Sequence, residues 1–313
     1  MKSALAAALL VCLCLSARAQ SQDEPLLGDA SAVLQWAKLR AASMPSAARA
    51  ARGGTDNPWK RAATPAPGRA ESIGAYAAGC LRGGEELPLS GPGFEVMRPS
   101  RRRFYGHPRL IAFVRALGSS VSGAGLGTLL VGDLAQPRGG PTLSGHASHQ
   151  TGLDVDVWYR QAKPGERPSA ADRETWTTPE MVVPDFVRLA RSWNPRELEV
   201  LRLAASDPGV ERIFVNPIIK QEACRLHGGA SWLGKLRPWW GHDDHFHARL
   251  TCTPGDRHCA NPADPIPPGD GCDGVAAWLT PAKRDEARRQ RTEPGEPPKM
   301  PALPPQCRQV LAD

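Results

Sequence analysis

Two histidine-rich segments constrain the fold of this chain more than any other feature of its sequence. Five of the eight histidines lie in these segments, His146–Asp156 and Trp239–His247. Neutral imidazole is the commonest protein ligand for zinc, and a carboxylate often completes such a site. Because the segments are far apart in the chain, we expect a fold that brings two loops or strand ends together at one metal ion.

The upstream segment offers histidine and aspartate side chains with a turn between them. Gly152 stands between His149 and Asp156, where the chain can fold back. Polar and apolar residues alternate over 153–158, which predicts a half-buried strand. Asp154 and Asp156 then share one face of that strand, so either carboxylate could reach a metal ion.

The downstream segment predicts a second strand. Residues 245–250 alternate in the same way, which places His245, His247 and Arg249 on one face. A catalytic zinc ion uses three protein ligands and leaves a fourth position for water. The two segments hold more candidates than that, so the surplus could supply a general base and donors to a transition state.

Spacing assigns these side chains only in part. We interpret His149 and His247 as metal ligands. His242 and His245 could each be a ligand or a base, and His146 fits a ligand and an ordinary residue equally well.

The residues around the histidines leave similar alternatives. Trp239 and Trp240 could line a substrate groove or pack in the core. Asp243 and Asp244 could accept hydrogen bonds from imidazoles or face solvent. The histidines without a partner pattern are interpreted as ordinary polar residues: His107, His227 and His258.

The N-terminus has the pattern of a secretory signal peptide. Lys2 supplies the positive charge, residues 4–15 the short apolar stretch, and Ala17-Arg18-Ala19 the cleavage site, so we expect cleavage after Ala19. A membrane span needs about 20 apolar residues, and we therefore expect no stable membrane insertion. Residues 20–56 are interpreted as a variable leader and 57–313 as the folded domain that carries both histidine segments.

Six cysteines remain after this cleavage, and an even number in a secreted chain predicts disulfides. Spacing alone does not fix which cysteines pair. No C-x-x-C pair supports zinc binding by thiolates.

The charge of the chain is mildly basic. The formal net charge is +7, and loss of Lys2 and Arg18 with the signal peptide reduces it by two. This excess suits an anionic polymer such as cell wall, whereas the signal peptide argues against nucleic acid as a partner. The densest basic run, Arg101-Arg102-Arg103, is either a solvated loop or a binding patch.

Local patterns predict a mixture of helices and strands. We expect helices that start at His107-Pro108 and at Asn194-Pro195, the latter with Glu197 at the third helical position. We expect short strands at 126–133, 153–158, 212–217 and 245–250. Residues 57–100 are rich in Pro and Gly and are predicted to be mostly loops, and the chain after Pro262 is predicted to wrap over the surface.

The motifs resemble those of known zinc peptidases. The spacing of His149 and Asp156, followed by His245-x-His247, resembles lysostaphin-type enzymes and D-Ala-D-Ala carboxypeptidases. The longer strings at 144–156 (SGHASHQTGLDVD) and 213–217 (IFVNP) are similar to those of the penicillin-insensitive murein endopeptidases of Gram-negative bacteria. The similarity extends from about Asn57 to the C-terminus and includes the cysteine positions.

This resemblance implies an α+β fold of the hedgehog and D,D-peptidase type, in which a small antiparallel sheet is flanked by helices and long loops. It implies zinc bound by His149, Asp156 and His247, with His146 lining the metal site. His245 would be the catalytic base, and His242 a donor to the developing oxyanion. The implied disulfides are Cys80–Cys307, Cys224–Cys272 and Cys252–Cys259.

The expected function is therefore that of a periplasmic zinc endopeptidase that hydrolyses D-alanyl–meso-diaminopimelyl cross-links in peptidoglycan. β-Lactams should not inhibit it, because no serine acyl-enzyme forms. Two alternatives share the zinc site: a D,D-carboxypeptidase acting on peptidoglycan stems, and a non-catalytic zinc-bearing cell-wall-binding protein. The presence of His242 and His245 beside three ligands argues against the binding protein.

Overall fold

The computed structural model describes residues 57–142, 147–266, 268–293 and 299–313. The predicted signal peptide (1–19), the leader (20–56) and His146 lie outside the described residues. The domain boundaries at residues 19 and 56 therefore remain predictions.

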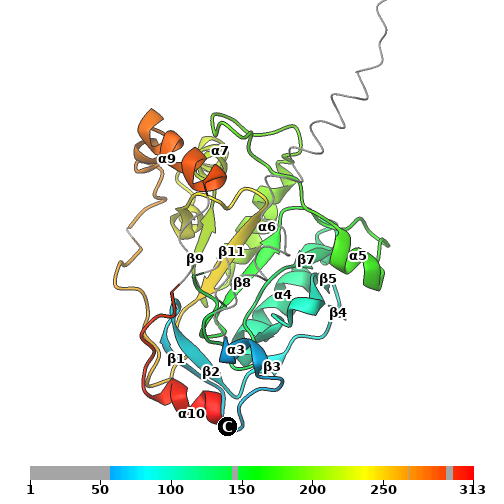
Figure 1. The fold of residues 1–313 in the computed structure, drawn as a ribbon. Coiled ribbons are helices and arrows are strands. Elements are labelled where there is room, and N and C mark those ends of the chain that lie inside the picture. The colour runs from blue at the N-terminus through cyan, green and yellow to red at the C-terminus, as the bar shows by residue number, and fades with distance from the viewer. Residues whose placement is uncertain (1–56, 143–146, 267, 294–298) are drawn as a thin grey trace, which may run out of the picture. The chain divides into compact units, whose positions relative to one another are not determined.

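A seven-stranded sheet forms the centre of the fold (Figure 1). The pairs β9–β11, β11–β8, β8–β7 and β5–β4 are antiparallel, whereas β10 pairs with β9, and β5 with β7, in parallel. The α+β class is confirmed, but the sheet is larger than expected and mixed. In spatial order the strands are β10 (Leu236–Pro238), β9 (Val210–Val215), β11 (His245–Leu250), β8 (Asp154–Trp158), β7 (Leu129–Val131), β5 (Phe94–Val96) and β4 (Ser90–Gly91).

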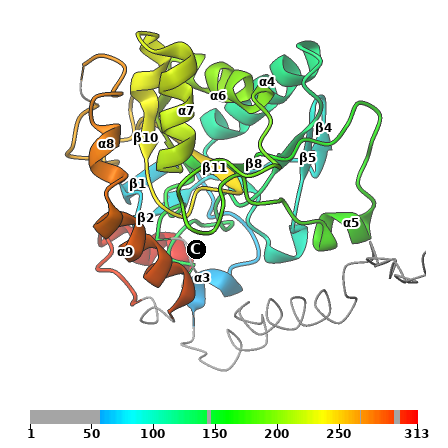
Figure 2. The same cartoon turned by 90° about the horizontal axis from the view of Figure 1, so that it is seen from above.

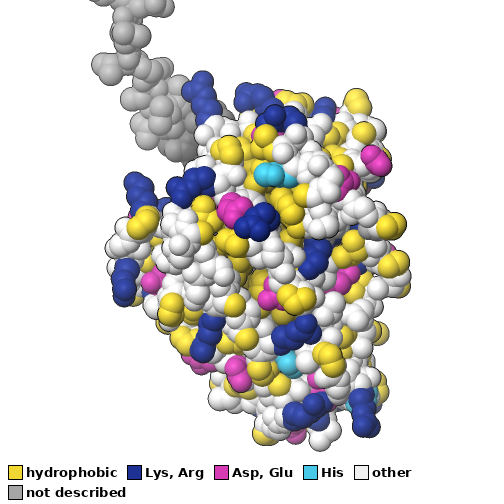
Figure 3. All heavy atoms as spheres, turned by 180° about the vertical axis from the view of Figure 1, so that it is seen from behind, with side chains coloured by type: hydrophobic (Ala, Val, Ile, Leu, Met, Phe, Trp, Pro, Cys, Tyr) yellow, Lys and Arg dark blue, Asp and Glu magenta, His cyan; other side chains and the backbone are white. Residues whose placement is uncertain are grey.

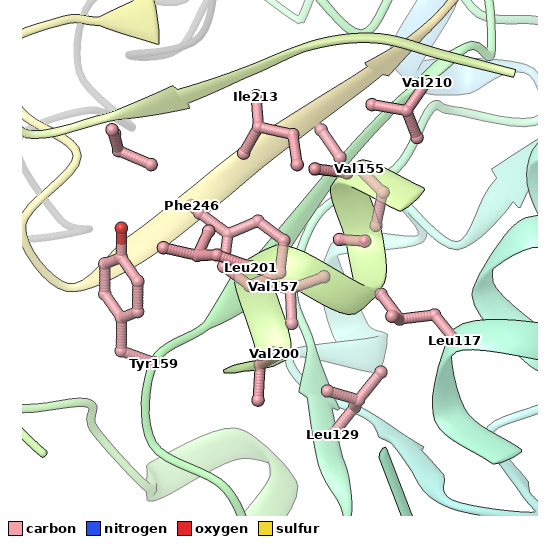
Figure 4. Packing of buried hydrophobic residues seen from close by; sticks show 14 of the residues in the cluster. Leu117, Leu129, Val155, Val157, Tyr159, Val200, Leu201, Val210, Ile213 and Phe246 are labelled. Carbon is pink, nitrogen blue, oxygen red and sulfur yellow. The ribbon is translucent and has the colours of Figure 1, made fainter. Parts of the chain in front are cut away.

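Three helices cover one face of this sheet (Figure 2): α4 (Pro108–Gly123), α6 (Arg196–Ser206) and α7 (Pro217–His227). One face of α4 carries four buried apolar residues: Leu110, Ile111, Val114 and Leu117. Between the layers, Val157 of β8 and Phe246 of β11 converge on Leu201 of α6 (Figure 4). Because side chains alternate along a strand, the opposite face of β8 and β11 carries the polar residues of the histidine segments.

Helix α6 buries an acidic side chain. Asn194 accepts a hydrogen bond from the Arg196 amide at 3.0 Å, as expected at this helix start. Glu197, predicted to belong to the same cap, instead points into the protein and is 6% exposed. Its Oε2 has no hydrogen-bond partner within the described part of the chain. Burial raises the pKa of Glu197 from 4.5 to about 8.

This burial predicts a pH-dependent stability. The folded chain keeps the Glu197 proton up to about pH 8, whereas the unfolded chain releases it near pH 4.5. The stability contributed by this group is therefore present below about pH 4.5 and is lost as the pH rises towards 8. Glu197→Gln should remove this dependence. The gain in free energy of unfolding over the native chain, measured with denaturant, should be larger at pH 7 than at pH 5 by on the order of 2 kcal/mol. Glu199→Gln, an exposed change on the same helix, should not show this difference.

The region 57–100 was predicted to be mostly loops, and this prediction is wrong. It contains an antiparallel hairpin of β1 (Glu71–Ala75) and β2 (Ala78–Arg82), and β3 (Glu85–Glu86), which pairs with β6 (Tyr105–Gly106). β4 and β5 of the main sheet lie there as well. Glycines within the strands of this region serve close packing rather than loops. At Gly79, for example, a Cβ would lie 2.3 Å from the Ile73 carbonyl oxygen.

The remaining elements are mostly short, and three of them follow residue 250. The chain after Pro262 was predicted to wrap over the surface, and it contains more helix than that prediction implies. None of the helices within the described ranges is long and apolar enough to cross a membrane. These elements are α3 (Pro58–Arg61), η1 (Pro99–Arg101), α5 (Ala170–Thr175), η2 (Ser231–Lys235), α8 (Val275–Trp278), α9 (Pro281–Thr292) and α10 (Gln306–Ala312).

Three disulfides tie these elements together, and they are the three pairs that the resemblance implies. Cys80–Cys307 joins β2 to α10, so the C-terminal helix lies against the β1–β2 hairpin (Figure 1). Cys224–Cys272 joins α7 to the segment before α8. Cys252–Cys259 closes a short loop after β11.

The arginine run has a structural partner. Arg101 and Arg103 place guanidinium nitrogens 3.1 and 2.8 Å from Asp133 Oδ2, and the Asp133 carboxylate is buried. The Asp133 carbonyl in turn accepts a hydrogen bond from the Asp156 amide at 3.0 Å. Two of the three arginines therefore pair with an acid beside β8. On the face shown in Figure 3, the Lys and Arg side chains stand apart among neutral and hydrophobic ones.

Candidate metal centre

Strand register brings the two histidine segments together. β8 and β11 are antiparallel, with His247 directly opposite Asp156 and Arg249 directly opposite Asp154. Directly opposed residues of neighbouring strands place their side chains on the same face. Both strands were predicted from their alternation, but β8 is buried on both faces rather than half-buried. Its polar face is covered because it carries the site.

A turn before β8 adds the third member of the group. His149 has φ of +66°, a left-handed conformation that is uncommon for a non-glycine residue and frequent at functional sites. The Asp154 carboxylate accepts a hydrogen bond from the His149 amide at 3.1 Å. Gly152 follows with φ of +72°, and a Cβ there would lie 2.9 Å from the His107 amide. The predicted turn at Gly152 therefore exists and requires glycine.

His149, Asp156 and His247 form a compact buried group. Asp156 Oδ1 lies 3.3 Å from His149 Nε2 and 3.3 Å from His247 Nδ1. One ligand atom from each side chain lies within 4.8 Å of the other two. Two imidazole nitrogens and a carboxylate oxygen are a donor set found at catalytic zinc sites. These three residues therefore fit a metal ion.

Asp154 lies beneath this group and takes a different role from Asp156. Its Oδ1 accepts hydrogen bonds from His247 Nε2 at 2.8 Å and from Arg249 Nε at 2.7 Å. Burial alone would raise the pKa of Asp154, but the charges of Arg249 and His247 hold it far below its usual range. The ionised carboxylate thus fixes the His247 ring with Nδ1 towards the metal group. The guanidinium of Arg249 also stacks on Tyr76, at 4.1 Å from its ring centroid.

This arrangement predicts that Asp154 tunes metal affinity. Asp154→Asn keeps the side-chain shape but weakens the orientation of His247, so zinc affinity should fall about 10- to 100-fold, measured by competition with a chelator of known affinity. Asp256→Asn is the matched control, because Asp256 is also buried but contacts His107. Equal zinc affinity in the Asp154 variant and the native chain would contradict the assignment.

His245 lies at the rim of the group, on the same strand face as His247. Its Nε2 is 3.7 Å from Asp156 Oδ1, and its Nδ1 is 2.5 Å from Asp244 Oδ1. Burial lowers its pKa, but the charge of Asp156 and the hydrogen bond to Asp244 outweigh burial and raise it to about 9. A nitrogen that faces the metal group without belonging to its closest set is suited to proton transfer.

His242 lies beside His245, with ring centroids 5.2 Å apart. Its Nδ1 lies 3.3 Å from the Trp239 carbonyl, which can only accept a hydrogen bond, so Nδ1 carries the proton. Burial lowers the pKa of His242 well below its ordinary value. Its ring stacks near Phe214 of β9 at 5.9 Å, and Phe214 also meets His247 edge-on.

The two tryptophans before this loop have different environments. Trp239 is 55% exposed and packs edge-on against Phe214 beside the histidines. Trp240 is partly buried against Phe186 and Trp278. Trp240 therefore contributes to packing, whereas a role for Trp239 in a substrate groove stays a prediction.

The other histidines lie apart from the group. His107 caps α4 by accepting a hydrogen bond from the Arg109 amide, which is a structural role that its helix position could have revealed. His227 packs against Trp232, and His258 contacts Glu71. Sequence reasoning missed the ion pair between buried Asp154 and Arg249, and it gave Phe214 no role in the site.

Comparison with known proteins identifies the family of this chain. A family model described as penicillin-insensitive murein endopeptidase matches residues 72–312. The penicillin-insensitive murein endopeptidase of Klebsiella pneumoniae subsp. pneumoniae is 41% identical over 266 residues, covering 81% of this chain and 90% of the relative. That of Haemophilus influenzae is 42% identical over 260 residues, covering 81% and 87%. One from Escherichia coli O139:H28 is 39% identical over 266 residues, covering 81% and 90%.

An α+β fold with a buried His-Asp-His group, within a matched region that contains all of the candidate site, defines a metallopeptidase. The chain belongs to the penicillin-insensitive murein endopeptidase family.

Proposed function

We propose that this protein is a zinc endopeptidase that hydrolyses D-alanyl–meso-diaminopimelyl cross-links of peptidoglycan. The observation that carries the proposal is the buried group of His149, Asp156 and His247 in a chain of this family. The imidazoles of His242 and His245 beside that group support a catalytic protein over one that only binds cell wall. Exposed Trp239 supplies a surface for an extended substrate beside them.

In the proposed mechanism His149, Asp156 and His247 hold the zinc ion. Bound zinc supplies Lewis-acid polarisation of the scissile carbonyl and lowers the pKa of water. His245 accepts the proton of the attacking water at Nε2 and later passes a proton to the leaving amine. No side chain forms a covalent bond to the substrate, so a β-lactam has no nucleophile to acylate.

His242 would stabilise the developing oxyanion by donating a hydrogen bond. Its Nδ1–H is directed at the Trp239 carbonyl, so Nε2 donates only when it carries a second proton. The neighbouring Phe214 ring limits how far the imidazole can turn. In this proposal His242 can therefore donate to the oxyanion only after its Nε2 has taken up a proton within the site.

We place the mature enzyme in the periplasm. Three disulfides suit an oxidising compartment, and zinc held by His and Asp leaves the cysteines out of metal binding. The predicted signal peptide with cleavage after Ala19 supports export.

Purified cross-linked muropeptide dimers test the proposal directly. The protein should convert dimers to monomers, a chelator should abolish this activity, and added zinc should restore it. Penicillin should leave the rate unchanged. Release of terminal D-alanine from monomers without dimer cleavage would identify a D,D-carboxypeptidase instead, and binding without any hydrolysis would identify a cell-wall-binding protein.

A further inference from the structure

His245 has a hydrogen-bond partner that the proposed mechanism does not use. Its Nδ1 lies 2.5 Å from Asp244 Oδ1, while its Nε2 lies 3.7 Å from Asp156 Oδ1 and so faces the metal group. An ionised carboxylate only accepts hydrogen bonds. In the neutral imidazole, the form in which His245 can act as a base, the proton therefore lies on Nδ1 and the lone pair on Nε2.

The backbone of Asp244 is held in place by the end of strand β8. Its carbonyl accepts hydrogen bonds from the Tyr159 amide at 3.1 Å and from Thr178 Oγ1 at 2.9 Å. Tyr159 is fully buried, so the anchor is part of the core. The Asp244 side chain itself is 42% exposed and contributes little to that core. It is therefore a side chain on a fixed backbone that can be changed without opening a cavity.

The neighbouring acid cannot take the same role. Asp243 is buried, and its Oδ2 lies 3.2 Å from Arg291 Nη1 of helix α9. Its backbone carbonyl is used by the Met181 amide. Of these two aspartates, it is Asp244 whose carboxylate bonds to a histidine of the site, whereas Asp243 pairs with Arg291.

We propose that Asp244 is a positioning residue for His245. Its carboxylate holds the Nδ1–H tautomer and aims the Nε2 lone pair at the metal group. When a water O–H bond breaks, its proton binds Nε2, and the imidazolium formed is stabilised by the Asp244 charge until the proton leaves with the amine. The inference rests on the proposed function, which makes His245 the base.

Three substitutions of Asp244 separate positioning from simple packing. Asp244→Asn keeps the shape, but its amide can donate to Nδ1 and favour the wrong tautomer. Asp244→Ala removes the hydrogen-bond partner of His245. Asp244→Glu keeps a carboxylate, and the partly exposed position has room for the longer side chain. We expect kcat on muropeptide dimers to fall about 10- to 100-fold in the Asn and Ala variants, with KM and zinc content unchanged and with partial recovery in the Glu variant.

A spectroscopic measurement accompanies the kinetics. The proton shared by His245 and Asp244 should give a downfield ¹H NMR signal in the zinc-loaded protein, which Asp244→Ala and His245→Ala should both remove. Glu199→Ala is the control, because Glu199 has similar exposure (41%) and pairs with Arg202 on α6. It should keep both the signal and the activity.

The outcomes distinguish this inference from the proposed function. If Asp244→Asn and Asp244→Ala keep the native kcat while His245→Ala is inactive, the positioning role is overturned and His245 remains the base. Full activity in His245→Ala overturns the base assignment itself. A loss in Asp244→Ala that the isosteric Asn restores fully shows packing, and it also overturns the inference.

Discussion

Replacing His245 by alanine should leave zinc near one ion per chain and lower turnover by about 10²- to 10⁴-fold, the usual contribution of a general base. The reason is geometric: His245 Nε2 lies at the rim of the group, whereas His149, Asp156 and His247 form its compact centre. Metal analysis of the purified variant, with single-turnover hydrolysis of muropeptide dimers, measures both quantities.

Replacement of the proposed ligands, unlike replacement of His245, should lower the metal content. His149→Ala, Asp156→Ala and His247→Ala each remove one of three donors, so zinc content should fall and activity with it. If His245→Ala emerges without metal while His247→Ala retains it, the two histidines of the H-x-H pair have exchanged roles.

Removing the Cys80–Cys307 disulfide should cost about 2–5 kcal/mol of stability, at the upper end of that range. This bridge closes a sequence separation of 227 residues and links two fully buried cysteines. The double variant Cys80→Ala, Cys307→Ala avoids a free thiol and measures the cross-link by denaturant unfolding. Thiol titration of the native mature chain should detect no free cysteine.

The shortest bridge is the natural comparison. Cys252–Cys259 closes a separation of 7 residues, so its removal restores less conformational freedom to the unfolded chain. In the chain-entropy model it should cost about half as much. An equal or larger loss from the short bridge would show that native-state contacts, rather than chain entropy, dominate these disulfides.

The ligand candidates could be predicted from the sequence because their chemistry and spacing are local. Alternation placed His245 and His247 on one face, and Gly152 indicated the turn after His149. Asp154 and Asp156 could not be separated in this way, because they have the same periodicity. Their roles differ only through cross-strand register, which pairs Asp154 with Arg249 and Asp156 with His247.

The fold could be predicted where the periodicity of apolar residues is regular. Helix α4 and strand β11 have the positions expected from their patterns. The hairpin of β1 and β2 could not be predicted, because its strands are short and glycine there serves close packing rather than a turn. Glu197 followed the pattern of a helix cap but is buried, because a local pattern does not show which side of a helix start meets the core.

The insertion of β11 between β8 and β9 has a consequence for timing. β11 is synthesised after both of its neighbours, and it brings His247 to a partner strand that precedes it by a long stretch of chain. The group of three donors is therefore incomplete in every shorter nascent chain. Tight metal uptake should therefore begin only once β11 has been synthesised and has paired with β8.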